Sequence, residues 1–286
     1  MLKKRQIRGE INILNKSLDS KQLDILFTEV QECAKLAVRM QKDIAVSYKT
    51  DGSVLTKTDL EISKRIINTI RELFPTCNVI SEEEKTPYDV DAPYTFVLDP
   101  IDGTDVYSNG FPSFAVSLGI LDNQRIPVGC MIIAPRFGKA KESLEIRLDP
   151  GCDLIIDGEI VNSVEENKDE VRQITISSKS QKFVDFTNYH GKVRTFGSSI
   201  IHILCPVVFP FIQACINQKA FIWDICSSHA VLNHVGMKIV YSDGSPLLYT
   251  DKMIIDRDVC DKTIYCGTDS GIKKLMKDLP MKVGKD

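Results

Sequence analysis

The 286-residue sequence lacks the short motifs that mark several common kinds of catalytic site. Its nine cysteines form no Cys-x-x-Cys pair and its four histidines show no His-x-x-x-His spacing, so a zinc site is not expected. It also has no Gly-x-Ser-x-Gly elbow, no Walker loop and no Gly-x-Gly-x-x-Gly turn. These absences remove the usual signals of serine hydrolases, nucleoside triphosphatases and dinucleotide-binding enzymes.

The sequence also has no strong charge of one sign and no long hydrophobic run. Its 36 basic and 39 acidic residues nearly cancel, which speaks against a nucleic acid polymer as partner. The basic segment Met1–Arg8 is not followed by the apolar stretch of a secretory signal. The most apolar segment, Ile200–Ile216, is shorter than the roughly 20 residues that span a bilayer. Because no run is long enough to span a bilayer, we expect no membrane contact. Most cysteines have apolar neighbours, which predicts reduced thiols in a cytoplasmic protein.

The first part of the chain reads as two helices joined by a turn or hairpin. An apolar stripe of helical period predicts a helix that begins at Asp19 or Ser20 and runs to about residue 43. The capping-box pattern Thr58–Glu61 predicts the start of a second helix, which ends before Pro75. The segment Lys49–Thr56 between them is typical of a turn or hairpin.

Strand patterns dominate the rest of the sequence. Alternating or continuous apolar runs bounded by turn residues predict strands at 78–81, 94–99, 114–121, 127–134, 173–177, 193–196, 238–241 and 263–267. Residues 223–235 read as a helix. The apolar content of 43% suffices for one large core or two moderate ones. We therefore expect an α+β first half (1–150) that binds metal and an α/β second half (151–286) that completes the site, with the boundary within 138–170.

The most informative segment is Asp99-Pro100-Ile101-Asp102-Gly103-Thr104, directly after an apolar run. Pro100 fixes φ where the strand ends, and Gly103 permits a tight turn. Two carboxylates and a backbone carbonyl offer the oxygen ligands that Mg²⁺ prefers. A helix beginning near Thr104 would direct its free N–H groups at an anion. The segment therefore predicts a cradle for a divalent cation and a phosphate.

Other carboxylates could join this cradle, although each has an ordinary explanation when taken alone. Glu82 and Glu83 end a predicted strand in a run of three acids, which is usually a solvated loop. Asp224 and Asp59 each stand near a helix start, where a carboxylate commonly complements the helix dipole. Since ligand sites gather beyond strand ends, these acids can converge on Asp99. They would then repel one another unless a cation neutralised them.

In this order and spacing, the acidic motifs resemble the inositol monophosphatase family of Mg²⁺-dependent, lithium-inhibited phosphatases. That family includes 3′(2′),5′-bisphosphate nucleotidases and archaeal fructose-1,6-bisphosphatases. The resemblance spans roughly residues 20–270 and rests on Glu82-Glu83, Asp99–Thr104, Trp223-Asp224, Lys49–Asp59, Phe111-Pro112, Gly197-Ser198 and Gly244–Leu247. It implies a layered αβαβα sandwich of the sugar-phosphatase type, usually a homodimer, with the metal site between the two halves.

The resemblance also implies the metal ligands. One Mg²⁺ would be held by Glu82, Asp99 and the Ile101 carbonyl. A second would be held by Asp99, Asp102 and Asp224, and Glu82 would also reach a third, weaker ion. Lithium would compete for the second cation site after hydrolysis.

The remaining roles come from the resemblance in the same way. Asp59, Glu82 and Thr104 are implied as catalytic residues, with Asp59 and Thr104 orienting the attacking water. The backbone N–H groups of Gly103 and Thr104, with Ser198, would grip the phosphate. The substrate-binding set as a whole comprises Asp102, Gly103, Thr104, Ser198 and Asp224. The expected activity is hydrolysis of a small phosphate ester.

The substrate signals point in two directions. Gly197-Ser198-Ser199 is similar to the nucleotidase branch, but the lysine and histidine of that branch fall on Ile201 and Gln181. The loop Asp105–Pro112 matches the spacing of inositol phosphatases, although their carboxylate seven residues before Asp224 falls on Asn217. The segment 203–216 is also unusually apolar.

We therefore expect inositol 1-phosphate or a sugar phosphate as substrate, with adenosine 3′,5′-bisphosphate as the alternative. A non-catalytic homologue that binds metal or phosphate is the alternative of a different class. The intact acidic residues argue against it.

Overall fold

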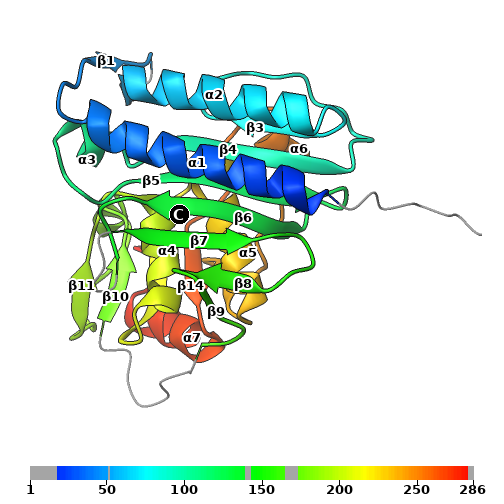
Figure 1. Cartoon of the computed structure of the whole chain (residues 1–286). Helices are drawn as coiled ribbons and strands as arrows, with labels where there is room; N and C mark the ends of the chain where they lie inside the picture. Colours follow the sequence, from blue (N-terminus) through cyan, green and yellow to red (C-terminus); the bar gives the residue numbers. More distant parts are fainter. Residues whose placement is uncertain (1–17, 51, 139–142, 165–172, 283–286) are drawn as a thin grey trace, which may run out of the picture.

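The computed structural model describes residues 18–50, 52–138, 143–164 and 173–282. Five layers of alternating helices and sheets make up the molecule (Figure 1). Helices α1 (Ser20–Met40) and α2 (Lys57–Leu73) cover one face of a seven-stranded sheet. Helices α4 (Ser199–Val208) and α5 (Cys226–His234) separate it from a five-stranded sheet, and α7 (Asp269–Asp278) covers the far face. The predicted αβαβα sandwich is confirmed.

The seven-stranded sheet has its strands in chain order, and only β3 and β4 run parallel. The other neighbouring strands are antiparallel, and the tight turn between β5 and β6 is one example of how the chain reverses. Asp122 Oδ1 accepts hydrogen bonds from the backbone N–H groups of Gln124 (2.9 Å) and Ile126 (2.8 Å), which reverses the chain. The strands are β3 (Asn78–Ser81), β4 (Tyr94–Asp102), β5 (Ala115–Asp122), β6 (Pro127–Ala134), β7 (Leu144–Leu148), β8 (Leu154–Ile156) and β9 (Glu159–Ile160).

The five-stranded sheet is mixed, in the order β11-β10-β12-β14-β13. Strand β10 runs parallel to both of its neighbours, and β14 runs antiparallel to both of its own. The strands are β10 (Gln173–Ile176), β11 (Lys192–Arg194), β12 (Ile212–Asn217), β13 (Lys238–Tyr241) and β14 (Ile264–Gly267). The sheets thus change between β9 and β10, and the division into halves at residue 150 stays a prediction.

Short elements complete the fold and surround the site. They are the hairpin β1 (Val46–Tyr48) and β2 (Val54–Thr56), α3 (Thr104–Ser108), α6 (Asp251–Ile254), and the 3₁₀ turns η1 (Ser180–Lys182) and η2 (Ile222–Asp224). The hairpin predicted over 49–56 is confirmed. Helix α1 begins as predicted, because Asp19 accepts a hydrogen bond from the Gln22 N–H at 3.0 Å.

The capping box of α2 was placed wrongly by the sequence pattern. The helix is capped by Thr56 and Asp59, two residues before the predicted pair Thr58 and Glu61. Thr56 has an extended backbone, and its N–H donates to Asp59 Oδ2 at 2.9 Å. Asp59 is consequently fixed inside the first turn and fully buried.

The unusually apolar segment 203–216 forms the end of α4 and most of strand β12. An apolar helix that Ser198 caps agrees with the sequence, whereas the strand was not predicted. Helix α4 is buried between the two sheets, and β12 is the middle strand of the five-stranded sheet and is buried on both faces, so neither needs a polar face. Pro206 lies inside α4 and cannot donate to the carbonyl of His202. The hydroxyl of Thr175 donates to that carbonyl instead, at 2.7 Å, which satisfies the acceptor from the neighbouring sheet.

The expectations about membrane and redox state fare as follows. No helix within the described residues is both long and apolar enough to cross a bilayer. All nine cysteines are free and seven of them are buried, in keeping with reduced thiols. The N-terminal segment Met1–Arg8 and the charged stretch 165–170 lie outside the described residues.

A close contact between β5 and α5 seats the part of the chain that follows the Trp223-Asp224 motif. A Cβ on Gly119 would lie 2.6 Å from Cys226 Sγ and 2.8 Å from the backbone nitrogen of Ser227. Beside it, the hydroxyl of Ser117 donates to that of Ser227 at 2.6 Å. The start of α5 therefore rests directly on the strand, where only glycine fits.

Gly119→Ala should lower the free energy of unfolding by about 1–3 kcal/mol, because the added methyl overpacks this contact. Urea unfolding followed by circular dichroism measures the change. Adding Cys226→Ala to the variant should recover part of the loss by removing the nearest atom, with Cys226→Ala alone as control. Unchanged stability in Gly119→Ala would contradict this account of the packing.

Candidate active site

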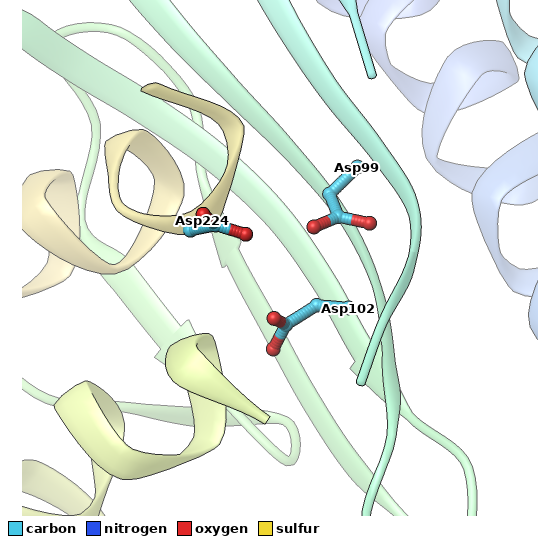
Figure 2. Close-up of side chains that lie close together, drawn as sticks. All are labelled: Asp99, Asp102 and Asp224. Carbon is cyan, nitrogen blue, oxygen red and sulfur yellow. The ribbon is translucent and has the colours of Figure 1, made fainter. Parts of the chain in front are cut away.

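A bulge in β4 brings the two aspartates of the central motif to the same side of the strand. Residues three apart on a regular strand point to opposite faces. Here Asp99 pairs with Ser117 but Asp102 pairs with Ala115, so β4 carries one extra residue between them. Asp99 is 1% exposed and Asp102 4%. Both carboxylates turn toward the same space in Figure 2.

Asp224 reaches this space from the other half of the chain. It ends η2, and its Oδ2 accepts a hydrogen bond from the Phe221 N–H at 2.8 Å. One carboxylate oxygen from each of Asp99, Asp102 and Asp224 lies within 4.8 Å of the others (Figure 2). The structure thus brings together the three residues that the resemblance assigns to the second cation.

The electrostatics of this cluster favour a bound cation. Burial raises the pKa of Asp99 well above its usual value, and the neighbouring charges of Glu82, Asp102 and Asp224 raise it further. The pKa of Asp224 is raised in the same way, by burial and then by Asp102 and Glu82. Asp99 Oδ1 is buried and has no hydrogen-bond partner within the described part of the chain. An oxygen-rich, crowded acidic cluster with an unpaired acceptor fits a divalent cation such as Mg²⁺.

Asp102 is also held by the N-terminus of α4. The backbone N–H of Ser199 donates to Oδ1 at 3.1 Å, that of Ile200 donates to Oδ2 at 2.9 Å, and the Ser198 hydroxyl donates to Oδ2. These bonds lower the pKa of Asp102, but burial outweighs them and raises it to about 6. The carboxylate therefore caps a helix of the second half with a residue of the first.

The hydroxyl of Ser198 therefore donates to Asp102 and does not face an exposed ligand-binding surface. It is fully buried, and its hydroxyl also accepts from the Ile201 N–H at 3.1 Å as the N-cap of α4. Its contact with phosphate stays a prediction. Gly197, just before it, has a φ of 85°, and a Cβ there would lie 2.2 Å from Val106 Cγ1. Glycine is required for this approach to α3.

Asp59 and Thr104 lie in contact beside the cluster. Thr104 Oγ1 is 3.2 Å from Asp59 Oδ1 and 2.9 Å from the Ile101 carbonyl oxygen. Burial raises the pKa of Asp59 to about 6, although hydrogen bonds from Thr56 and Thr104 oppose the shift. Gly103 has a φ of 91° and turns the chain into α3, where Thr104 is the first residue.

Glu82 lies outside the group of three and is paired with a lysine. Lys49 Nζ is 2.7 Å from one carboxylate oxygen of Glu82 and 2.7 Å from one of Glu83. Burial, with the charge of Glu82, raises the pKa of Glu83 to about 7. Lys49 comes from the β1–β2 hairpin, and its sequence motif gave it no role. The hairpin therefore places the ammonium group of Lys49 beside the carboxylates of Glu82 and Glu83.

Sequence reasoning also missed Arg257, which contacts the backbone carbonyls of Ser81 and Glu82. Arg257 stands in a loop after α6 with no periodic or motif signal. Asp51 and the side chain of Gln181 lie outside the described part of the structure.

The sequence matches known proteins over most of its length. The family described as "Inositol monophosphatase family" matches residues 19–266. The inositol monophosphatase of Dictyostelium discoideum is 24% identical over 249 residues, which cover 81% of this chain and 84% of that relative.

Solved structures share the fold at low identity. Staphylococcal inositol monophosphatase-1, in an inhibitory complex soaked in 100 mM LiCl, has a TM-score of 0.75 at 14% identity and covers 93% of this chain and 97% of its own. A second protein, SaIMPase-II, was solved with inositol monophosphate and has a TM-score of 0.67 at 17% identity, covering 90% of this chain and 93% of its own. It was also solved with 2′AMP. Because the family match covers most of the sequence, this chain belongs to the inositol monophosphatase family and is a phosphatase that hydrolyses phosphoric monoesters.

Proposed function

We propose that this phosphatase uses about two or three Mg²⁺ ions to hydrolyse inositol 1-phosphate or a sugar phosphate. The observation that carries the metal proposal is the buried Asp99 Oδ1, an unpartnered acceptor among the described residues, surrounded by Asp102 and Asp224. Such a group is strongly destabilising unless a cation pairs with it.

The residues divide the work of metal binding between the two halves. Asp99, Asp102 and Asp224 would hold one ion, and Glu82, Asp99 and the Ile101 carbonyl another. For Glu82 to bind metal, its carboxylate must be shared with or released by Lys49, which now contacts it at 2.7 Å. Bound Mg²⁺ would neutralise charge on the phosphoryl group and lower the pKa of water.

Thr104 and Asp59 would orient a water, and Asp59 would accept its proton. A hydroxyl has one proton to donate, so Thr104 can direct it to Asp59 Oδ1 while its lone pairs accept from water. The raised pKa of Asp59, about 6, suits a group that accepts a proton near neutral pH. The N–H groups of Gly103 and Thr104, at the start of α3, would bind the phosphate oxygens.

The preference for a sugar or inositol phosphate rests on two residues, Ile201 of α4 and Asn217 of β12. Ile201 stands where the nucleotidase branch carries a lysine, and it is apolar and 1% exposed, so it supplies no cation for a second phosphate. Asn217 ends β12 with a buried amide nitrogen that lacks a hydrogen-bond partner within the described residues. That donor suits a neutral sugar hydroxyl. The complexes of SaIMPase-II keep adenosine 3′,5′-bisphosphate as the second candidate.

The homodimer and the cytoplasmic location stay predictions drawn from the resemblance and the cysteine content. Lithium inhibition belongs to the same proposal, and the staphylococcal complex soaked in LiCl supports it. A non-catalytic homologue is not proposed, because the chain belongs to a family of phosphatases and keeps its acidic residues.

Asp99→Asn and Asp224→Asn should each lower Mg²⁺-dependent phosphate release by at least about 100-fold, since an uncharged amide cannot replace a ligand carboxylate. Circular dichroism should show an intact fold. Asp251→Asn, which changes an exposed carboxylate on helix α6, is the matched control and should keep its activity. Full activity in either site variant would contradict the ligand assignment.

Metal stabilisation should grow with pH. In the metal-free protein, the folded-state pKa of Asp102 is raised to about 6 and those of Asp99 and Asp224 lie well above their usual values. The stability that these three carboxyl groups contribute when protonated is therefore fully present below their unfolded-state pKa. It is lost as the pH rises through their folded-state pKa. Mg²⁺ needs the ionised carboxylates and should restore it.

The melting temperature in Mg²⁺ should exceed that in EDTA by roughly 5 °C at about pH 8 and by little at about pH 5. Differential scanning fluorimetry across this range measures the gap. A gap of the same size at both pH values would show that these carboxylates do not hold the metal.

A panel of phosphate esters tests the substrate. Inositol 1-phosphate or fructose 1,6-bisphosphate should be hydrolysed at least about tenfold faster than adenosine 3′,5′-bisphosphate at equal concentration, because no cation stands at residue 201. Phosphate release with Mg²⁺, with EDTA and with added Li⁺ gives the comparison. A preference for the adenosine compound would move this chain to the nucleotidase branch.

A further inference from the structure

Arg257 belongs to the half of the molecule that supplies Asp224. Its loop follows α6 and is anchored on the segment before η2, where the Cys260 N–H donates to the Ala220 carbonyl at 2.9 Å. Arg257 itself has a φ of 60°, a left-handed conformation that side-chain-bearing residues seldom adopt. The surrounding contacts must therefore hold this residue in place.

The guanidinium of Arg257 contacts both acidic segments of the site. Its Nη2 donates to the carbonyl oxygen of Ser81 at 2.5 Å and to that of Glu82 at 2.9 Å. Its central carbon lies 5.0 Å from the ring centroid of Trp223, the residue directly before Asp224. One side chain thus spans from the end of β3 to η2.

The contact occurs where the sheet stops supporting the Glu82 segment. Strand β3 ends at Ser81, and the Glu82 N–H still bonds to the Leu98 carbonyl at 3.2 Å. Arg257 supplies donors for the two carbonyls at this strand end. The charges of Glu82 and Glu83 also attract its guanidinium. A planar fork that donates on one edge and stacks through its face suits this position, and lysine cannot reproduce both contacts.

We propose that Arg257 is a positioning residue for the metal site. It fixes the main chain of Glu82 against Trp223, and so sets how far the Glu82 carboxylate stands from Asp224. In this role it acts through the main chain of Glu82 and through Trp223, and not by binding the metal itself. Its removal therefore weakens Mg²⁺ binding more than it weakens the fold. This inference rests on the proposed metal-dependent function.

Trp223 is the only tryptophan in the chain, so tryptophan fluorescence reports on the surroundings of this one ring, which contacts Arg257 and Phe221. Mg²⁺ binding to the full chain is measured by isothermal titration calorimetry and by Trp223 emission. Arg257→Met keeps an apolar stem over the ring and removes every donor. We expect about tenfold weaker Mg²⁺ binding, an altered Trp223 emission, and a melting temperature in EDTA close to that of the wild type. Arg257→Lys keeps the charge and should recover part of the affinity.

Arg125→Met is the matched control. Arg125 also has a positive φ, 64°, and its side chain bonds to Asp251 of α6 and to the Tyr249 carbonyl, but it does not contact Glu82. Its removal should leave Mg²⁺ affinity unchanged. Wild-type affinity in Arg257→Met overturns the inference while leaving the proposed function standing. A wild-type chain that binds no Mg²⁺ overturns both.

If Arg257→Met does not fold, Arg257→Lys decides. A folded Arg257→Lys with weakened Mg²⁺ binding supports positioning. A variant that binds Mg²⁺ normally but melts much lower in EDTA assigns Arg257 to the fold alone and overturns the inference.

Discussion

The contact between the Asp102 carboxylate and the N-terminus of α4 joins the two halves of this phosphatase at the proposed metal site. Two backbone N–H groups and the Ser198 hydroxyl donate to one buried carboxylate, so the second half is aligned by a residue of the first. The helix needs an acceptor for its free amides, and the carboxylate needs donors once it is buried. The carboxylate and the helix terminus therefore satisfy each other's hydrogen bonds. This contact also fixes the position of Asp102 in the proposed metal site.

The charge balance around this contact explains the arrangement of the basic residues. Asp99, Asp102 and Asp224 crowd together with raised pKa values, and within the described part of the chain Asp102 alone of the three accepts hydrogen bonds from several donors. Lys49 pairs with Glu82 at the edge of this group, and Arg257 holds the Glu82 carbonyl from the other half. The protein thus neutralises the rim of the acidic cluster and leaves its centre for a cation.

Much of the fold was predictable because its signals are local. The stripe of α1, the strands β3 to β6 and the hairpin near Lys49 follow from period and turn residues within short windows. The acidic motifs were found for the same reason, since each is contiguous in sequence. Their convergence was only an expectation, because it depends on a bulge in β4 that adds one residue between Asp99 and Asp102.

What escaped prediction depends on contacts between distant segments. The sequence offers two neighbouring capping patterns for α2, and the helix uses the one that begins at Thr56. This choice depends on the burial of Asp59 beside Thr104, which is distant in sequence. Strand β12 was not predicted because it is the middle strand of the five-stranded sheet, where burial on both faces removes the alternation of apolar and polar residues. Arg257 has no sequence signal, since its importance comes from a loop that folds back on Trp223. Local patterns therefore locate the ligands, whereas the residues that space them apart become visible only when the two halves are packed together.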